Sequence, residues 1–391
     1  MGKRYVFQIK DADRRLKKIC QKGMIELFGA QPPAAVSERL ARELKIVKHN
    51  QHSSYYLLAH MLAMEAKRLH HFAFFRGCIT ASLIAYTSGI SDINPLSAEY
   101  GGINLPFEIT REKYEGVEPT LDIQCSVAFI LFAQSLLARE LPEYRCLAYP
   151  LTGDLGIRVV RIYLSKDEEL PMEEPLDNKE VELDSYPNFI FFDDYFHLTF
   201  IASEAMELAR YNRFYRDIVE SFDERNSDKM VPKLWRFAKK YDESTVGFKR
   251  LKVRTYEELI TVLGMAHSTD VWGGLAKKMV LDGSLPLKDM IGSRDDLFLY
   301  LLKIGFDNED AYTIMNRVRI GKRLTEEQLA EMISHGAEEW VIDLCMRAKY
   351  IFPRAHVAQM IRKDAFCLHE PDEIDDLPSS DHMVLRDSFV G

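Results

Sequence analysis

Apolar residues recur at intervals of three and four along the first part of the chain, which is the spacing of helices with one buried face. Leu40, Leu44 and Val47 follow Ser37 in this way, and serine is a favoured residue at a helix N-cap. We therefore predict a helix that Ser37 caps, with neighbouring helices over 12–27 and from about 53 onward.

The middle of the chain changes to the period of two that is typical of strands. Val160, Ile162 and Leu164 alternate with Arg161 and Tyr163. Strands are predicted over 105–109, 121–124, 144–164 and 188–202. Two helices, over 126–140 and 203–221, are predicted to accompany these strands. Residues 165–185 are acidic and interrupted by proline, which indicates a solvated loop.

From Tyr256 onward the pattern becomes entirely helical. Thr325 and Gln328 have the spacing of a capping box, and glycines stand where helices are expected to stop, at Gly283, Gly305 and Gly321. We predict an α+β fold in which a mixed sheet with packed helices (1–221) is followed by a helical bridge (222–255) and an all-α lobe (256–367). Residues 368–391 are acidic and are predicted to be a disordered tail.

Composition narrows the class of protein. The chain has 391 residues, 47% of them hydrophobic, and a net charge of −9, so any nucleic-acid surface must be a local basic patch. Its six cysteines contain no Cys-x-x-Cys pair, which argues against a zinc site and for the reducing cytoplasm. The longest apolar run, Cys125–Leu137, is too short and too polar to span a bilayer.

Several short motifs follow one another in a particular order. They are Phe75-Arg76-Gly77-Cys78, Asn94-Pro95-Leu96, Glu118-Pro119-Thr120-Leu121-Asp122, the run from Gly264 to Trp272, Ile291-Gly292-Ser293-Arg294-Asp295-Asp296 and the run from Lys349 to His356. In type, order and spacing these motifs resemble the palm and fingers of the PolC-type DNA polymerase III alpha subunit of Gram-positive bacteria. The resemblance implies a DNA-directed DNA polymerase, which is a nucleotidyltransferase of DNA replication. It also implies a palm over 1–221 and fingers over 256–367.

The metal-binding carboxylates of that family are incompletely matched. A polymerase holds two Mg²⁺ ions that stabilise the attacking and leaving oxygens, and hard cations prefer carboxylate oxygens. The family places two aspartates in a Pro-Asp-x-Asp strand, where this chain has Thr120 and Asp122. Asp122 is therefore the one expected catalytic and metal-binding residue, with weak Mg²⁺ binding. The third family carboxylate corresponds to Ala202 in the best register, with Asp193, Asp194 and Glu204 as alternatives.

Other residues match family positions that contact the nucleotide or DNA. The phosphate-binding turn keeps Arg76, Gly77 and Ser82, although bulkier side chains separate them. The helical lobe contributes further expected contacts with phosphate, which are His267, Thr269, Arg294, Arg317, Arg319, Lys322, Arg354 and His356. Structural roles are the alternative for some of them. Arg76 is then a surface or ion-paired arginine, the basic run is a solvated helix end whose cations lie near the dipole, and His356 is a packed histidine at a helix start.

Three functions remain open at the level of sequence. The favoured one is a PolC-like protein that binds DNA or nucleotides, and replisome proteins, but transfers nucleotides weakly or not at all. The second is a minimal polymerase whose metals are held by substitute carboxylates. The third is an interaction protein that keeps the fold without affinity for DNA. None of these three functions requires a membrane.

Overall fold

A computed structural model describes residues 7–71, 73–97, 103–104, 121–126, 128–151, 157–165, 196–203 and 227–366. Several predictions fall on residues outside this part of the chain. They are the strand over 105–109, the acidic loop over 165–185 apart from Ser165, the first half of the strand pair over 188–202, nearly all of the helix over 203–221 and the tail over 368–391.

The first helices are α1 (Ala12–Phe28), α2 (Ala34–His49) and α3 (Ser53–Arg68). The expected cap at Ser37 is wrong, because α2 begins three residues earlier, after Pro33. The backbone N–H groups of Val36 and Ser37 donate to the Pro33 carbonyl. Proline has its φ fixed in the helical range and needs no N–H partner, so it opens the helix before the serine is reached.

A five-stranded sheet follows, in the order β1-β4-β7-β6-β5. Its β4 and β7 pair in parallel, while the other three pairs are antiparallel. The prediction of a mixed sheet in an α+β fold is thus confirmed for the described residues. The strands are β1 (Ala73–Phe75), β4 (Leu121–Cys125), β5 (Arg145–Leu151), β6 (Ile157–Ser165) and β7 (Phe196–Ser203).

One face of this sheet is covered by helices. Leu121, Ile123 and Cys125 are buried along β4, and α5 (Phe129–Glu140) packs against both α3 and β5. Alternate residues of a strand point to opposite faces, so Asp122 and Gln124 point away from this core. A second, two-stranded sheet pairs β2 (Leu96–Ser97) with β3 (Ile103–Asn104).

The described residues from 227 onward form helices without a strand longer than one bridge. They include the predicted capping box at Thr325 and Gln328, and all three predicted glycine stops have positive φ. The helices are α8 (Ser227–Tyr241), α9 (Tyr256–His267), α10 (Gly274–Asp282), α11 (Arg294–Lys303), α12 (Asn308–Arg319), α13 (Glu326–Ser334), α14 (Glu339–Arg347) and α15 (Arg354–Phe366), with short 3₁₀ turns η6 (Glu243–Phe248) and η7 (Leu287–Asp289).

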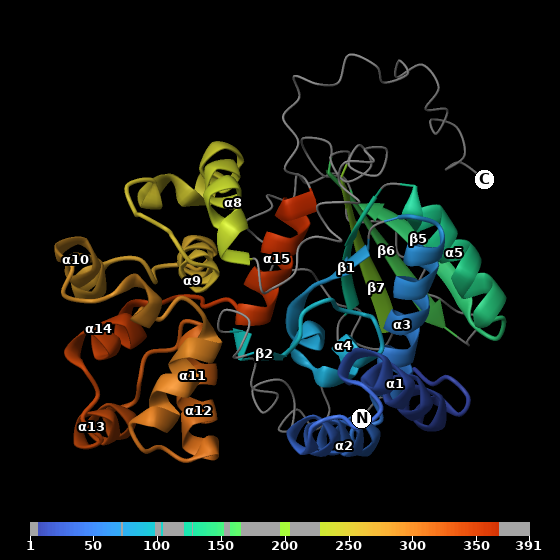
Figure 1. The fold of residues 1–391 in the computed structure, drawn as a ribbon, viewed down its shortest axis with the longest axis horizontal. Helices are drawn as coiled ribbons and strands as arrows, with labels where there is room; N and C mark the ends of the chain where they lie inside the picture. Colours follow the sequence, from blue (N-terminus) through green and yellow to red (C-terminus); the bar gives the residue numbers. More distant parts are fainter. Residues whose placement is uncertain are drawn as a thin grey trace.

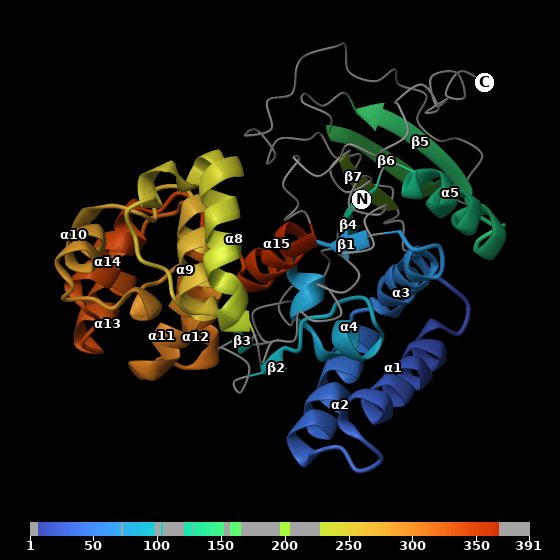
Figure 2. The same ribbon diagram turned by 45° about the horizontal axis from the view of Figure 1, so that its top comes forward.

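Helix α15 lies between the two halves of the molecule (Figures 1 and 2). On one side it packs against α8, α9 and α11, and on the other against β1, β3 and the 3₁₀ turn η1 (Gly77–Ala81). Ala81 and Ile93 from the N-terminal half accordingly join the hydrophobic core of the C-terminal helices. A second core lies under the sheet and the first three helices.

Gly23 marks the close approach of α1 to α4 (Leu83–Thr87). A Cβ atom at this position would overlap the carbonyl oxygen of Thr87, which is backbone and cannot rotate away. We expect Gly23→Ala to lower the free energy of unfolding by about 2 kcal/mol, the usual cost of overpacking. This cost exceeds the gain of about 1 kcal/mol in helix propensity, and urea unfolding measures the difference.

The matched control is Gly283→Ala. Gly283 has φ of 85°, and nothing lies within 4 Å of its added Cβ, so only the left-handed backbone strain of about 1–2 kcal/mol remains. A Gly23→Ala protein as stable as the parent would show that α1 and α4 separate at little cost.

Candidate functional site

Asp122 is half-buried in the second position of β4. Its carbonyl oxygen accepts a 2.8 Å hydrogen bond from the backbone N–H of Arg76, the residue that follows β1. On its other side Asp122 is in register with Thr199 of β7. The cross-strand positions beside this carboxylate therefore carry a guanidinium and a hydroxyl residue, not a second carboxylate.

None of the carboxylates predicted to bind metal together with Asp122 lies in the described strands. Ala202 is in register with Cys125, three residues along β4 from Asp122. Thr120, Asp193, Asp194 and Glu204 lie outside the described residues. Within the part of the chain that is described, no three histidine, cysteine or acidic residues are grouped to hold a metal ion. The donors described around Asp122 therefore do not fit a pair of Mg²⁺ ions.

The expected phosphate-binding turn runs through η1, which Gly77 opens, into α4. Ser82 caps α4 and is fully buried. Its Oγ accepts a 3.0 Å hydrogen bond from Ala85 N–H and donates a 2.9 Å bond to the Ile79 carbonyl. Both bonds stay inside the protein, so in this structure Ser82 shapes the turn and does not face solvent.

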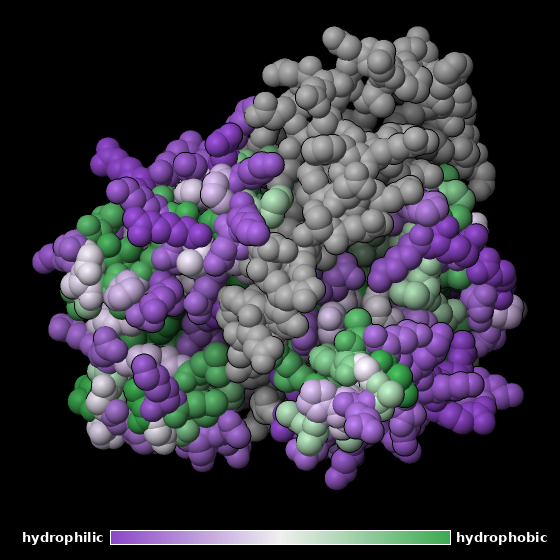
Figure 3. Space-filling view, viewed as in Figure 1, coloured by the Kyte–Doolittle hydropathy of each residue, from purple (hydrophilic) through white to green (hydrophobic). Residues whose placement is uncertain are grey.

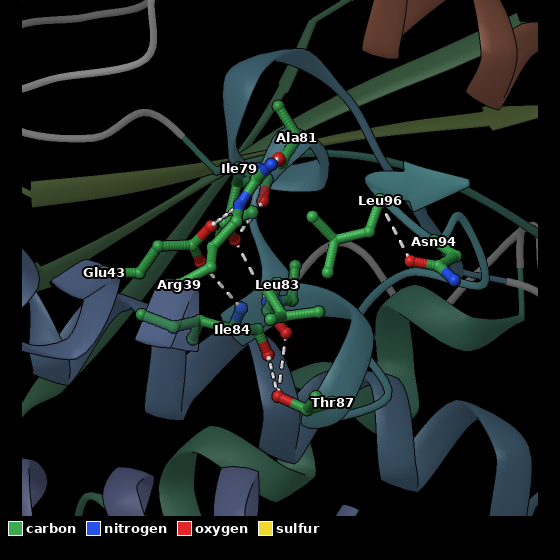
Figure 4. A network of polar contacts seen from close by, with 11 residues as sticks. Arg39, Glu43, Ile79, Ala81, Leu83, Ile84, Thr87, Asn94 and Leu96 are labelled. Carbon is green, nitrogen blue, oxygen red and sulfur yellow. Dashed lines mark hydrogen bonds and ion pairs between the residues drawn. The ribbon is translucent and has the colours of Figure 1, made fainter. Parts of the chain in front are cut away.

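A buried ion pair of α2 supports the same turn (Figure 4). Arg39 Nε lies 2.8 Å from Glu43 Oε1, with side chains only 9% and 0% exposed. Arg39 also donates to the Ala81 carbonyl at 3.2 Å, and Glu43 Oε2 accepts the Ile84 N–H at 3.0 Å. Backbone N–H groups at a helix start attract anions. At α4 the anion that binds there is the carboxylate of Glu43, which accepts the Ile84 N–H.

Burial is the strongest influence on Glu43 and raises the pKa of its carboxyl above the ordinary value. Arg39 and the N–H groups of Leu83 and Ile84 act in the opposite direction on this pKa. Neither member of the pair was predicted as a site residue from the sequence. Their i, i+4 spacing on an amphipathic helix is a signal for an ion pair, but it does not reveal that the pair is buried.

Arg76 and His356 meet across the junction that α15 forms. The Arg76 guanidinium lies 3.4 Å from Nε2 of His356, although 280 positions separate the two residues in sequence. His356 is buried and stacks on Phe352, with ring centroids 4.8 Å apart. Two of the predicted contact residues are thus brought together, but they contact each other.

The segment 349–353 gathers several other candidates by backbone hydrogen bonds. Thr269 N–H donates to the Tyr350 carbonyl at 2.9 Å, and Arg294 N–H donates to the Phe352 carbonyl at 3.0 Å. Ile351 N–H in turn donates to the Arg319 carbonyl at 3.1 Å. The end of α9, the start of α11 and the end of α12 therefore converge on this short extended segment.

Arg354 is held by carboxylates of the protein. Its guanidinium lies 2.6 Å from Asp296 and 3.8 Å from Glu257, and its backbone N–H donates to Asp295 at 2.7 Å. Burial alone lowers the pKa of Arg354, but Asp296 and the other acids outweigh it and the pKa rises. Arg294, beside it in the fold, is also buried. The positive charge of Arg354 is therefore largely compensated within the protein.

His267 has a carboxylate partner of its own. Its Nε2 lies 2.8 Å from Oδ2 of Asp242, and Ser244 Oγ donates to Oδ1 of the same carboxylate at 2.6 Å. Burial raises the pKa of Asp242, but the hydrogen bonds from His267 and Ser244 outweigh that effect and lower the pKa overall. Asp242 was not foreseen, because nothing in the sequence links it to a histidine 25 positions away.

The remaining basic candidates lie at the end of α12. Arg319 is half-buried and donates from Nε to Asn316 Oδ1 at 2.7 Å. Arg317 Nε donates to the Arg323 carbonyl. Lys322 is exposed. Among the predicted contact residues, Lys322 and Thr269 are thus the ones whose side chains face solvent most openly.

Comparison with known proteins relates this chain to bacterial replicative polymerases. Residues 14–127 match the profile of the bacterial DNA polymerase III alpha NTPase domain. DNA polymerase III PolC-type of Caldanaerobacter subterraneus subsp. tengcongensis is 22% identical over 463 residues, which cover 90% of this chain. The corresponding proteins of Oceanobacillus iheyensis and Staphylococcus aureus are 42% and 40% identical over 124 residues, or 31% of this chain.

The chain spans only part of these relatives. It covers 32% of the Caldanaerobacter protein and 9% of each of the other two. Among the described helices, none has the length and apolar character needed to cross a bilayer.

Proposed function

Because the chain is PolC-like, related to the alpha subunit of PolC-type DNA polymerase III, we propose that it is a DNA-binding protein of replication whose nucleotidyl transfer is absent or very slow. The proposal has two parts, a weakened catalytic centre and a retained affinity for DNA, and each can be tested separately.

The setting of Asp122 carries the first part. In-line phosphoryl transfer with two metal ions needs several carboxylates on one small patch. The neighbours of Asp122 across the sheet are Arg76 and Thr199. The nearest described position in β1 carries an arginine, and a divalent cation bound at Asp122 would be repelled by the positive charge of Arg76. We infer that Asp122 binds Mg²⁺ weakly.

The turn after β1 supports the same conclusion for the triphosphate. A phosphate bound at the start of α4 would have to displace Glu43, which is fully buried and accepts the Ile84 N–H. It would also approach Ser82, whose hydroxyl is enclosed. Weak triphosphate binding and weak metal binding together favour a protein that does not extend primers.

Affinity for DNA is inferred from the resemblance and from the exposed cations of the C-terminal helices. Lys322 is solvent-exposed near the segment 349–353, to which Arg319 is joined by its carbonyl. Contacts of this kind bind phosphates without regard to sequence and weaken as salt rises. Replisome proteins are a further class of partner that the family relationship suggests.

Primer extension tests the catalytic part. We expect no incorporation above background with Mg²⁺ or Mn²⁺, and no difference between the parent and Asp122→Asn, because too few metal ligands remain for the charge to matter. Incorporation that Asp122→Asn abolishes would instead establish a minimal polymerase with substitute carboxylates. Incorporation that persists in the Asp122→Asn protein would come from a contaminating polymerase. Further purification of this variant should then reduce the incorporation to background.

A further inference from the structure

Helix α8 has two chemically opposite faces. Its inward face is formed by four buried apolar residues, which are Val231, Leu234, Trp235 and Ala238. The opposite face has four cations in one line, at Lys229, Lys233, Arg236 and Lys240. At 3.6 residues per turn these four lie within an arc of about 60° and extend over about 17 Å of helix.

The connection between α8 and α9 continues the positive charge. Four more exposed cations follow there, at Lys249, Arg250, Lys252 and Arg254. From 227 to 254 the chain has nine lysine and arginine residues and three acidic ones, although the whole chain has a net charge of −9. In Figure 3 strongly hydrophilic residues gather over the part of the surface where Figure 1 shows α8.

Most cations of this region have no ion-pair partner within the described part of the chain. None of Lys229, Lys233 and Arg236 has an ion pair to a described carboxylate, and the same holds for the four cations of the connection. Asp228 accepts the Tyr256 N–H, and Asp242 is bound to His267. Lys239 instead lies 5.5 Å above the Trp235 ring. The two described acids of the segment are thus occupied elsewhere.

We propose that this basic face, defined as Lys229, Lys233, Arg236, Lys240, Lys249, Arg250, Lys252 and Arg254, binds the phosphate backbone of duplex DNA. The proposal rests on the DNA binding proposed above and assigns it to a surface outside the motifs that resemble PolC. A stripe about 17 Å long lies opposite about five phosphates on one strand, since these follow at about 3.4 Å along the axis. Lysines predominate and act as point charges without base-specific geometry, so binding should not depend on sequence.

Fluorescence anisotropy with a labelled duplex of about 30 base pairs and mixed sequence tests this surface over a series of KCl concentrations. We expect the triple variant Lys229→Gln, Lys233→Gln, Arg236→Gln to bind at least about tenfold more weakly at low salt. We also expect the slope of log affinity against log salt to fall by about 2.7, because each phosphate contact contributes about 0.9. All three side chains are exposed, so thermal unfolding should be unchanged.

The control removes three exposed cations from the N-terminal helices, by Lys17→Gln, Lys18→Gln and Lys45→Gln. It should leave affinity and slope within error of the parent. Equal losses in the two triple variants would mean diffuse attraction to charge and would overturn the proposal. So would a preference for single-stranded DNA of the same length, or for polyglutamate over DNA.

The outcomes separate this inference from the proposed function. If the parent binds duplex DNA, and Arg319→Gln with Lys322→Gln weakens binding while the basic-face variant does not, the inference fails and the proposed function stands. If the parent shows no salt-dependent binding at all, the proposed affinity for DNA fails and this inference fails with it.

Discussion

Replacing Arg39 by alanine is expected to lower the free energy of unfolding by about 3–5 kcal/mol, the usual cost of leaving one partner of a buried ion pair alone. Glu43 is fully enclosed and lies 2.8 Å from Arg39. The variant also loses the bond from Arg39 to the Ala81 carbonyl. The turn between β1 and α4 should therefore loosen together with the loss of stability, and urea denaturation measures the effect.

The loss of stability caused by Arg39→Ala should increase as pH rises from acid to neutral. Burial raises the pKa of Glu43 in the parent, and Arg39 opposes that rise. Without Arg39 the folded-state pKa is higher still, so the folded variant keeps a proton that the unfolded chain releases above the ordinary glutamate pKa. The free energy of unfolding must then fall as pH rises through this interval. The gap between parent and variant should be smallest in acid and widen toward neutral pH.

Lys45→Ala on the same helix is the control. Lys45 is exposed, so its removal should change stability by less than about 0.5 kcal/mol. An Arg39→Ala protein that unfolds like Lys45→Ala at neutral pH, without any pH dependence, would mean that Glu43 is not confined as the structure has it.

Replacing Arg354 by methionine is expected to lower the free energy of unfolding by about 3 kcal/mol. Methionine keeps most of the packing volume but leaves Asp296 and Glu257 without their cation, and Asp295 is buried next to them. The Arg354 side chain is only 8% exposed, so water compensates little for the lost pair. Thermal and urea unfolding should agree on this loss.

Lys349→Met is the matched control, because Lys349 forms an ion pair of similar length at the protein surface. Lys349 Nζ lies 2.7 Å from Asp270, but its side chain is 73% exposed, and exposed pairs contribute less than about 1 kcal/mol. If Arg354→Met lowered affinity for DNA at unchanged stability, Arg354 would be a phosphate contact after all, as its place in the resemblance implies.

Local features of the fold were predictable from the sequence. Strands β4 to β7, helix α5 and the helix stops at three glycines follow from periodicity and from residues whose backbone preferences are strong. Strand β1 was not predicted, because three residues are too few to establish a period. The Thr325 capping box was predictable because both partners lie within one turn. The prediction of a cap at Ser37 was wrong because the helix already begins after Pro33. The N-cap preference of one residue does not show whether an earlier residue starts the helix.

Pairing over long distances was not predictable. The resemblance predicts contacts with nucleotide or DNA for His267, Arg294, Arg354 and His356, and these contacts stay predictions. Backbone hydrogen bonds join the segment 349–353 to Thr269, Arg294 and Arg319. The actual side-chain partners of His267 and Arg354 include Asp242 and Asp296. Those partners depend on how helices cross, which periodicity and spacing do not specify.

The position of α15 in the chain has a consequence for co-translational folding. This helix covers β1 and η1, yet it follows every other described element along the chain. Until α15 has left the exit tunnel, Ala81 and Ile93 lack the α15 side chains with which they share a hydrophobic core in the described structure. Nascent chains therefore pass through an interval in which these apolar residues are accessible to chaperones or to other chains, and this interval ends only when α15 has been synthesised and has packed.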